Sequence, residues 1–189
     1  MPDSLRALRR AACALALPIV CACAAEPASN ALPAAAPPPP LTGTSVAERL
    51  REYAENALAL DDPAPAAVRA AHGAADSTAA RPTPNRHLPG QTDSIVTLHY
   101  PGLTLEAYRT ADGRELVQRV DVLANRWLRR GPGIGAGRED VREALGVPTE
   151  QSDSSLAYLC TECGPVEEPI TFFFSDGRVR CVRFAFYVD

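Results

Sequence analysis

Cysteines are the residues whose type and spacing could most readily carry chemistry in this 189-residue sequence. Cys160 and Cys163 have the CxxC spacing of a redox pair or of half a zinc site, but no second CxxC or nearby histidine completes a metal set. Gly164-Pro165 follows and indicates a hairpin loop, whereas thioredoxin-type motifs open a helix. We therefore expect a structural disulfide between two of Cys160, Cys163 and Cys181, and the sequence does not say which two pair.

Histidines and glycines give weaker signals. His72, His87 and His99 have no candidate nucleophile or oxyanion motif beside them. The alternating glycines from Gly131 to Gly137 have the spacing of a nucleotide loop, but Pro132 interrupts the backbone amides and no lysine is present. A connector with Trp127 packed beside it is the preferred interpretation. The sequence thus predicts no enzyme, no cofactor and no metal site.

The first 22 residues read as an export signal. Three arginines precede the apolar run from Ala11 to Val20, which is too short to span a bilayer as a stable helix. Val20-Cys21-Ala22-Cys23 is similar to a bacterial lipobox, so Cys23 is the predicted site of diacylation, with palmitate-type chains, and Ala24 after it favours the periplasmic side of the outer membrane. Ala22-Cys23-Ala24 also satisfies the rule for ordinary cleavage, which leaves a soluble periplasmic or secreted protein as the alternative.

Charge and composition separate a tether from a folded part. Loss of residues 1–22 removes three arginines and one aspartate, so the net charge changes from −4 to −6. This acidic balance argues against nucleic acid and against an anionic membrane surface as partners. Residues 23–43 are rich in alanine and proline and favour an extended tether.

Short helices are expected before each of two groups of strands. Ser45 to Glu48 forms a capping-box pattern for a helix over 45–60, and a second short helix runs from Pro63 toward Gly73. Residues 74–92 read as a long loop. Strands over 94–100 and 103–109 flank the turn at Pro101-Gly102, and Asp112-Gly113 returns a third strand, which places Glu106 opposite Arg119 on the polar face.

The same order of elements then occurs a second time. Val68 to Gly73 matches Val141 to Gly146, and Asp112-Gly113-Arg114 matches Asp176-Gly177-Arg178. We therefore predict an α+β fold of two tandem units, 44–124 and 125–189, each with short helices packed on an antiparallel β-meander.

The segment from Ile134 to Pro148, with the strands after it, resembles the SmpA/OmlA (BamE-type) outer-membrane lipoproteins. The tandem arrangement resembles the two-repeat β-lactamase inhibitory protein fold. The first resemblance implies a role in outer-membrane assembly. The second implies a sheet that binds a partner protein.

The repeat also predicts a binding surface on the sheet. Because Arg119 maps to Arg183 and Tyr108 to Phe172, aromatic and arginine side chains should gather on the face that is polar in the first unit, which is the composition of interface hot spots. A β-bulge that shifts the register and buries some of these rings is the alternative. The predicted partner-binding residues are Phe172, Phe174, Arg183, Tyr187, Tyr108 and Arg119.

These observations favour a lipid-anchored periplasmic protein that binds another envelope protein. The sharpest form of this hypothesis is an inhibitor or immunity protein that acts on an envelope enzyme. The alternative is a structural lipoprotein that supports outer-membrane assembly or integrity.

Overall fold

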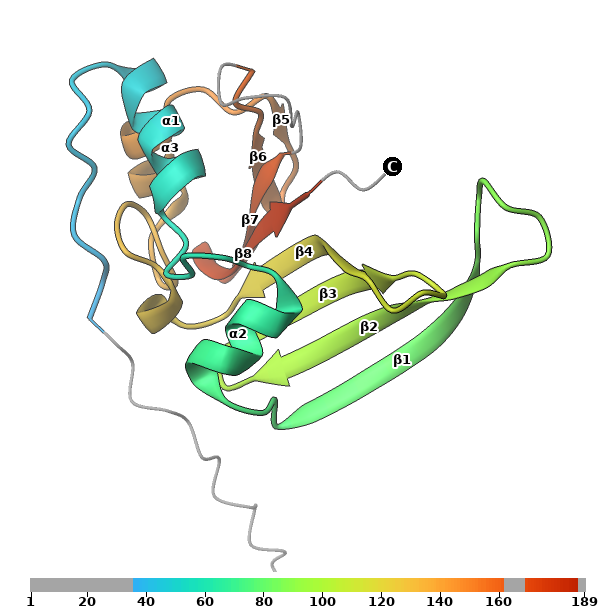
Figure 1. Cartoon of the computed structure of the whole chain (residues 1–189). Helices are drawn as coiled ribbons and strands as arrows, with labels where there is room; N and C mark the ends of the chain where they lie inside the picture. Colours follow the sequence, from blue (N-terminus) through green and yellow to red (C-terminus); the bar gives the residue numbers. More distant parts are fainter. Residues whose placement is uncertain (1–35, 162–168, 187–189) are drawn as a thin grey trace, which may run out of the picture. The chain divides into compact units, whose positions relative to one another are not determined.

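A single antiparallel sheet of eight strands dominates the computed structural model, which describes residues 36–161 and 169–186 (Figure 1). The strand order is β1-β2-β3-β4-β8-β7-β6-β5. The strands are β1 (Ser77–Pro84), β2 (Thr92–Tyr100), β3 (Leu103–Arg109), β4 (Glu115–Val122), β5 (Glu150–Gln151), β6 (Ser155–Tyr158), β7 (Ile170–Ser175) and β8 (Arg178–Ala185). The helices are α1 (Val46–Asn56), α2 (Pro65–His72) and α3 (Arg138–Leu145), with a 3-10 turn η1 (Asn125–Trp127). Within the described ranges no helix has the length and apolar character needed to cross a membrane.

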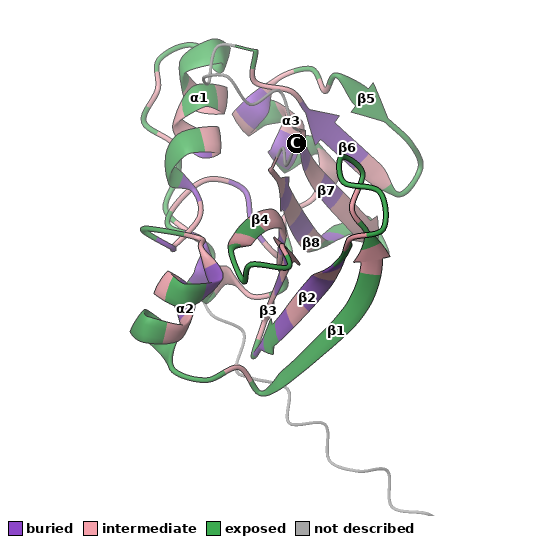
Figure 2. Ribbon diagram, turned by 45° about the vertical axis from the view of Figure 1, so that its right-hand side comes forward, coloured by how far each residue is buried: buried purple, intermediate pink, exposed green. Residues whose placement is uncertain are grey.

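The helices cover one face of the sheet (Figure 2). Tyr53 of α1 is fully buried and lies 5.6 Å from the ring of Phe172 on β7. Val68 of α2 and Val141 of α3 join the same buried cluster as the inward side chains of the strands. The apolar side chains on one face of the sheet therefore pack against the helices. Among the described residues, no helix covers the opposite face.

Local sequence signals account for the helix ends. Ser45 accepts a hydrogen bond from the Glu48 amide at 3.1 Å, and the Glu48 carboxylate accepts one from the Ser45 amide at 3.0 Å, which confirms the capping box. Gly73 and Gly146 end α2 and α3 with φ of 81° and 83°, where a side chain would be strained.

The register predicted for β2, β3 and β4 is confirmed. Leu98 pairs with Leu105, and Glu106 pairs with Arg119. Gly102 in the first turn has φ 74°, and a Cβ there would lie 2.5 Å from the Cβ of Ala124. A β-bulge follows between Glu106 and Ala107.

The prediction of two tandem α+β units is wrong. β4 pairs directly with β8, from Arg119↔Ala185 to Val122↔Val182, so the two stretches of chain form one continuous sheet. The buried side chains of both stretches also belong to one cluster. The matching segments share a local feature, because Tyr100 donates to the Gly73 carbonyl and Tyr158 donates to the Gly146 carbonyl, both at 3.2 Å. A repeated helix end does not make a separate unit when the edge strands of both halves pair with each other.

The loop predicted over 74–92 contains an edge strand, β1, which pairs with β2 from Ser77↔His99 to Pro84↔Thr92. Its residues are almost all exposed, so the strand has no apolar alternation to detect. Pro82 and Pro84 are compatible with this place because an edge strand has one unpaired side, where a missing amide hydrogen costs no ladder bond.

Part of the predicted tether is packed against the fold. The Gly131 amide donates to the Pro39 carbonyl at 2.7 Å. The Thr42 and Gly43 amides both donate to Glu52 Oε2 of α1, at 2.8 and 2.9 Å. Residues 36–43 therefore form an ordered border along α1, and the remainder of the predicted tether lies outside the described residues.

Candidate binding surface

The face of the sheet that carries no described helix, here called the helix-free face, is the candidate site. Alternation along the strands places the following side chains on it: Thr97, His99, Thr104, Glu106, Tyr108, Arg119, Asp121, Thr171, Phe173, Cys181 and Arg183. Its centre lies where β4 meets β8. The face is therefore assembled from both halves of the chain.

Four charged side chains form a ladder across this centre. Arg119 contacts Glu106 at 3.1 Å and Asp121 at 3.4 Å. Arg183 donates two hydrogen bonds to Asp121, at 2.7 and 3.0 Å, in the bidentate geometry that favours an arginine–carboxylate pair. The hydrogen bond to Asp121 is the main reason that the pKa of Arg183 is raised. Two positive and two negative charges thus balance within the ladder.

An aromatic ring completes the centre. The guanidinium carbon of Arg183 lies 4.8 Å from the ring centroid of Phe173, a cation–π contact. Phe173 is half-buried, and its backbone pairs with Cys181 on β8. The arginine side chains are about one-third exposed, at 33% for Arg119 and 35% for Arg183. A pre-positioned, partly exposed arginine–aromatic pair is a typical anchor in protein interfaces.

The predicted binding residues divide between the two faces. Tyr108, Arg119 and Arg183 lie on the helix-free face, as expected from the sequence. Phe172 is fully buried, and Phe174 lies on the helix-covered face opposite Val179, with the Arg138 guanidinium 4.6 Å from its ring. These two placements correct the prediction. Tyr187 lies outside the described residues.

The register of β7 explains the correction. Three residues separate Tyr108, the last side chain of β3 on the helix-free face, from Asp112 in the turn. Ser175, the corresponding side chain of β7, directly precedes Asp176. Aligning the two Asp-Gly turns therefore shifts β7 by an odd number of residues and assigns its side chains to the wrong face. Phe173, which the prediction missed, is the ring that reaches the surface.

A buried carboxylate supports one end of this face. Asp93 at the start of β2 is 4% exposed and accepts hydrogen bonds from Asn85 at 2.6 Å, Gln91 at 3.1 Å, the Ala111 amide at 2.8 Å and the Tyr108 hydroxyl. These hydrogen bonds, the one from Tyr108 foremost, lower the pKa of Asp93. The carboxylate thereby joins the β1–β2 loop, the β3–β4 loop and Tyr108.

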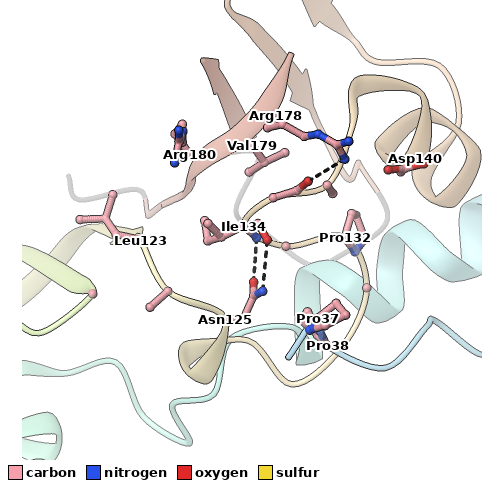
Figure 3. Close-up of a pocket in the computed structure, with 16 residues that line it drawn as sticks. Pro37, Pro38, Leu123, Asn125, Pro132, Ile134, Asp140, Arg178, Val179 and Arg180 are labelled. Atoms are coloured by element: carbon pink, nitrogen blue, oxygen red, sulfur yellow. Dashed lines mark hydrogen bonds between the residues drawn. The ribbon is translucent and has the colours of Figure 1, made fainter. Parts of the chain in front are cut away.

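The glycine-rich loop borders a separate, open cavity of about 960 Å³ (Figure 3). The loop amides are used within the protein: Ile134 donates to Asn125 at 2.7 Å, Gly135 to the Val179 carbonyl at 2.9 Å, and Ala136 to the Gly133 carbonyl at 3.1 Å. Amides engaged in this way are not available to cradle a phosphate, so the loop acts as a packed connector. Arg178, at the rim, donates to the Gly135 carbonyl at 3.1 Å.

Histidines and cysteines form no cluster in the described ranges. His72 packs edge-on against Trp127, with ring centroids 4.8 Å apart, and His99 contacts the Thr104 hydroxyl at 3.3 Å. No group of three or more histidine, cysteine or acidic side chains with metal-binding geometry occurs among the residues described. Cys181 is a free thiol whose pKa burial raises to about 11. Cys181 therefore takes no part in the predicted disulfide, and Cys163, another of its three candidates, lies outside the described residues.

Comparisons with known proteins add little. No family model and no curated protein sequence matches the chain. The chain is similar to a solved structure of a DUF4309 family protein (YjgB) from Bacillus subtilis, with 13% sequence identity and a TM-score of 0.41 over 75% of this chain and 96% of that chain. A likeness this distant carries no argument about function.

Proposed function

We propose that this protein is a lipid-anchored periplasmic binding protein that holds another envelope protein against the helix-free face of its sheet. The observation that carries the proposal is the pairing of Arg183 with Phe173 beside the balanced charge ladder. These side chains are already fixed by their neighbours, so binding a partner would cost little conformational entropy. The inhibitor or immunity role is the sharpest form of this proposal, and it depends on the resemblance to the two-repeat inhibitory proteins.

The chemistry of the face favours binding over catalysis. Each charged group of the ladder is neutralised by a neighbour, whereas a catalytic acid or base needs a proton-transfer role and a substrate position. We therefore propose a non-enzymatic protein that acts without a cofactor.

Affinity capture from a native envelope extract tests the binding role. The full chain serves as bait beside a Phe173→Ala, Arg183→Ala variant and an Arg142→Ala control, because Arg142 lies on α3 in the helical layer. Capture of one protein by the wild type and the control, with loss in the double variant, supports the proposal. Equal recovery by all three baits contradicts it.

The anchor needs its own test, since Cys23 lies outside the described residues. Incorporation of a palmitate analogue that is lost in Cys23→Ala supports lipid attachment. Processing without incorporation supports the soluble periplasmic or secreted alternative instead.

A further inference from the structure

The β1–β2 hairpin, residues 77–100 and here called the arm, extends beyond β3 and β4 and ends in the loop 85–91 (Figure 1). Its outer strand, β1, is exposed along nearly its whole length. An exposed edge strand is an aggregation hazard unless something blocks it, and Pro82 and Pro84 limit further strand pairing here. The arm is therefore suited to side-chain contacts and poorly suited to extending the sheet into a partner.

The loop at the tip is built with defined geometry. Asn85 Oδ1 accepts hydrogen bonds from the amides of His87 at 2.8 Å and Leu88 at 2.7 Å. The Leu88 carbonyl in turn accepts a hydrogen bond from the Gln91 amide at 3.1 Å. The side chains of Asn85 and Gln91 both donate hydrogen bonds to the Asp93 carboxylate. The backbone of Leu88 is thus fixed on both sides while its side chain remains 55% exposed. Leu88 is thus an exposed apolar residue on a tip whose backbone is held by hydrogen bonds.

The arm is positively charged although the whole chain is acidic. Its one acidic residue is Asp93, which is buried, whereas Arg81 and Arg86 are exposed. Neither arginine forms an ion pair or side-chain hydrogen bond within the described part of the chain. Most other arginines do, such as Arg109 with Glu115 and Arg130 with Glu52. Arg86 in the tip loop and Arg81 farther back on β1 therefore give the arm an apolar tip with a basic border.

We infer that the arm is a recognition element that inserts Leu88 into an apolar pocket bordered by acidic side chains on the partner protein. This inference rests on the proposed function and adds the chemistry of the partner's site. A membrane surface fits less well, because polybasic lipid-binding segments use clusters of about four to eight basic residues and the chain carries a net charge of −4. The arm forms one side of the helix-free face, since Thr97 and His99 lie on that face and Arg81 pairs with Ile95, which pairs with Tyr108.

Photo-crosslinking of the full chain tests the inference. Photo-leucine, which keeps the size and apolar character of leucine, replaces Leu88 at the tip or, as a control, Val147 beyond α3, which is 92% exposed. The expected result is one protein adduct from position 88 and none of the same protein from position 147. The crosslinked peptide of that partner should lie beside aspartate or glutamate residues.

Charge-matched variants complete the test. Arg81→Ala, Arg86→Ala should raise the dissociation constant for the crosslinked partner by about tenfold or more, as expected for the loss of two charged contacts. Arg51→Ala, Arg180→Ala removes the same charge from exposed positions on α1 and β8 and should change it less than about twofold. Equal effects of the two double variants, or no adduct from position 88, would overturn the inference.

Two further outcomes separate the inference from the proposed function. If Phe173→Ala, Arg183→Ala abolishes capture while Arg81→Ala, Arg86→Ala binds normally, the arm is not a recognition element and the proposed function stands. Arm-dependent binding to phosphatidylglycerol vesicles without a protein adduct would overturn the inference in favour of a membrane contact.

Discussion

Adjacent phenylalanines on β7 offer a direct check of the strand register. Phe172 is fully buried, with its ring centroid 5.6 Å from that of Tyr53 and 5.9 Å from that of Tyr158. Phe172→Ala removes this ring from the core and should lower the free energy of unfolding by about 3–5 kcal/mol. Phe173 is half-buried on the other face, so Phe173→Ala should lower it by about 1 kcal/mol or less.

Urea unfolding followed by tryptophan fluorescence measures both changes. Trp127 is the sole tryptophan of the chain and is 6% exposed, so its emission reports loss of the core. With a urea dependence of about 2 kcal/mol per molar, the Phe172 variant should unfold at a midpoint lower by roughly 2 M and the Phe173 variant by about 0.5 M at most.

The comparison stays informative if Phe172→Ala does not fold. Phe172→Leu keeps most of the apolar volume and should lower the free energy of unfolding by about 1.5 kcal/mol, still more than Phe173→Leu. Equal midpoints for the two positions, or a larger loss at Phe173, would refute the assigned register.

Three further predictions concern buried or paired groups. Tyr53→Phe removes the hydroxyl that donates to the Pro132 carbonyl at 2.8 Å, and should lower the free energy of unfolding by about 1–3 kcal/mol in urea titrations, because that buried carbonyl loses its donor. The hydrogen-bonded ion pair with Arg130 is the foremost cause that lowers the pKa of Glu52 to about 2, so the stability that Glu52 contributes is present above pH 4.5 and is lost as the pH falls toward 2. Glu52→Gln should therefore make the free energy of unfolding depend less steeply on pH between 4.5 and 2. An unchanged pH dependence would contradict this pairing. Since burial raises the pKa of Cys181 to about 11, its alkylation in the folded protein should be much slower at pH 8 than that of a free thiol and should accelerate up to pH 11, whereas fast labelling at pH 8 would refute the burial.

The sequence was sufficient for the parts of the fold that local turns determine. Pro101-Gly102 leaves two residues between β2 and β3, which fixes their register without further information. The Ser45 capping box likewise places the start of α1. These features depend on residues that are close along the chain.

Long-range pairing was the part that local signals could not supply. The joining of β4 to β8 depends on how two distant hairpins meet, and neither hairpin contains a signal for it. β1 could not be predicted from the sequence, because an exposed edge strand carries no alternation of apolar and polar residues. Repeated segments do not by themselves determine whether two hairpins form separate sheets or join into one.

For the candidate site, side-chain alternation was reliable where the register was known. Tyr108 and Arg119 lie on the expected face because their hairpin was placed correctly. Phe173 was missed because three consecutive phenylalanines alternate between faces, and the choice between them requires the length of the β7–β8 turn. The ion pair between Arg183 and Asp121 could not be foreseen without the pairing of β4 with β8.

The affinity of the captured partner for matched variants tests the central claim most directly. The dissociation constant would be measured by calorimetry for the full chain, for Phe173→Ala, Arg183→Ala and for Arg142→Ala. Binding through the helix-free face predicts at least about a tenfold loss for the double variant and less than about a twofold change for the control. Wild-type affinity in the double variant, or an equal loss in the control, would contradict the account.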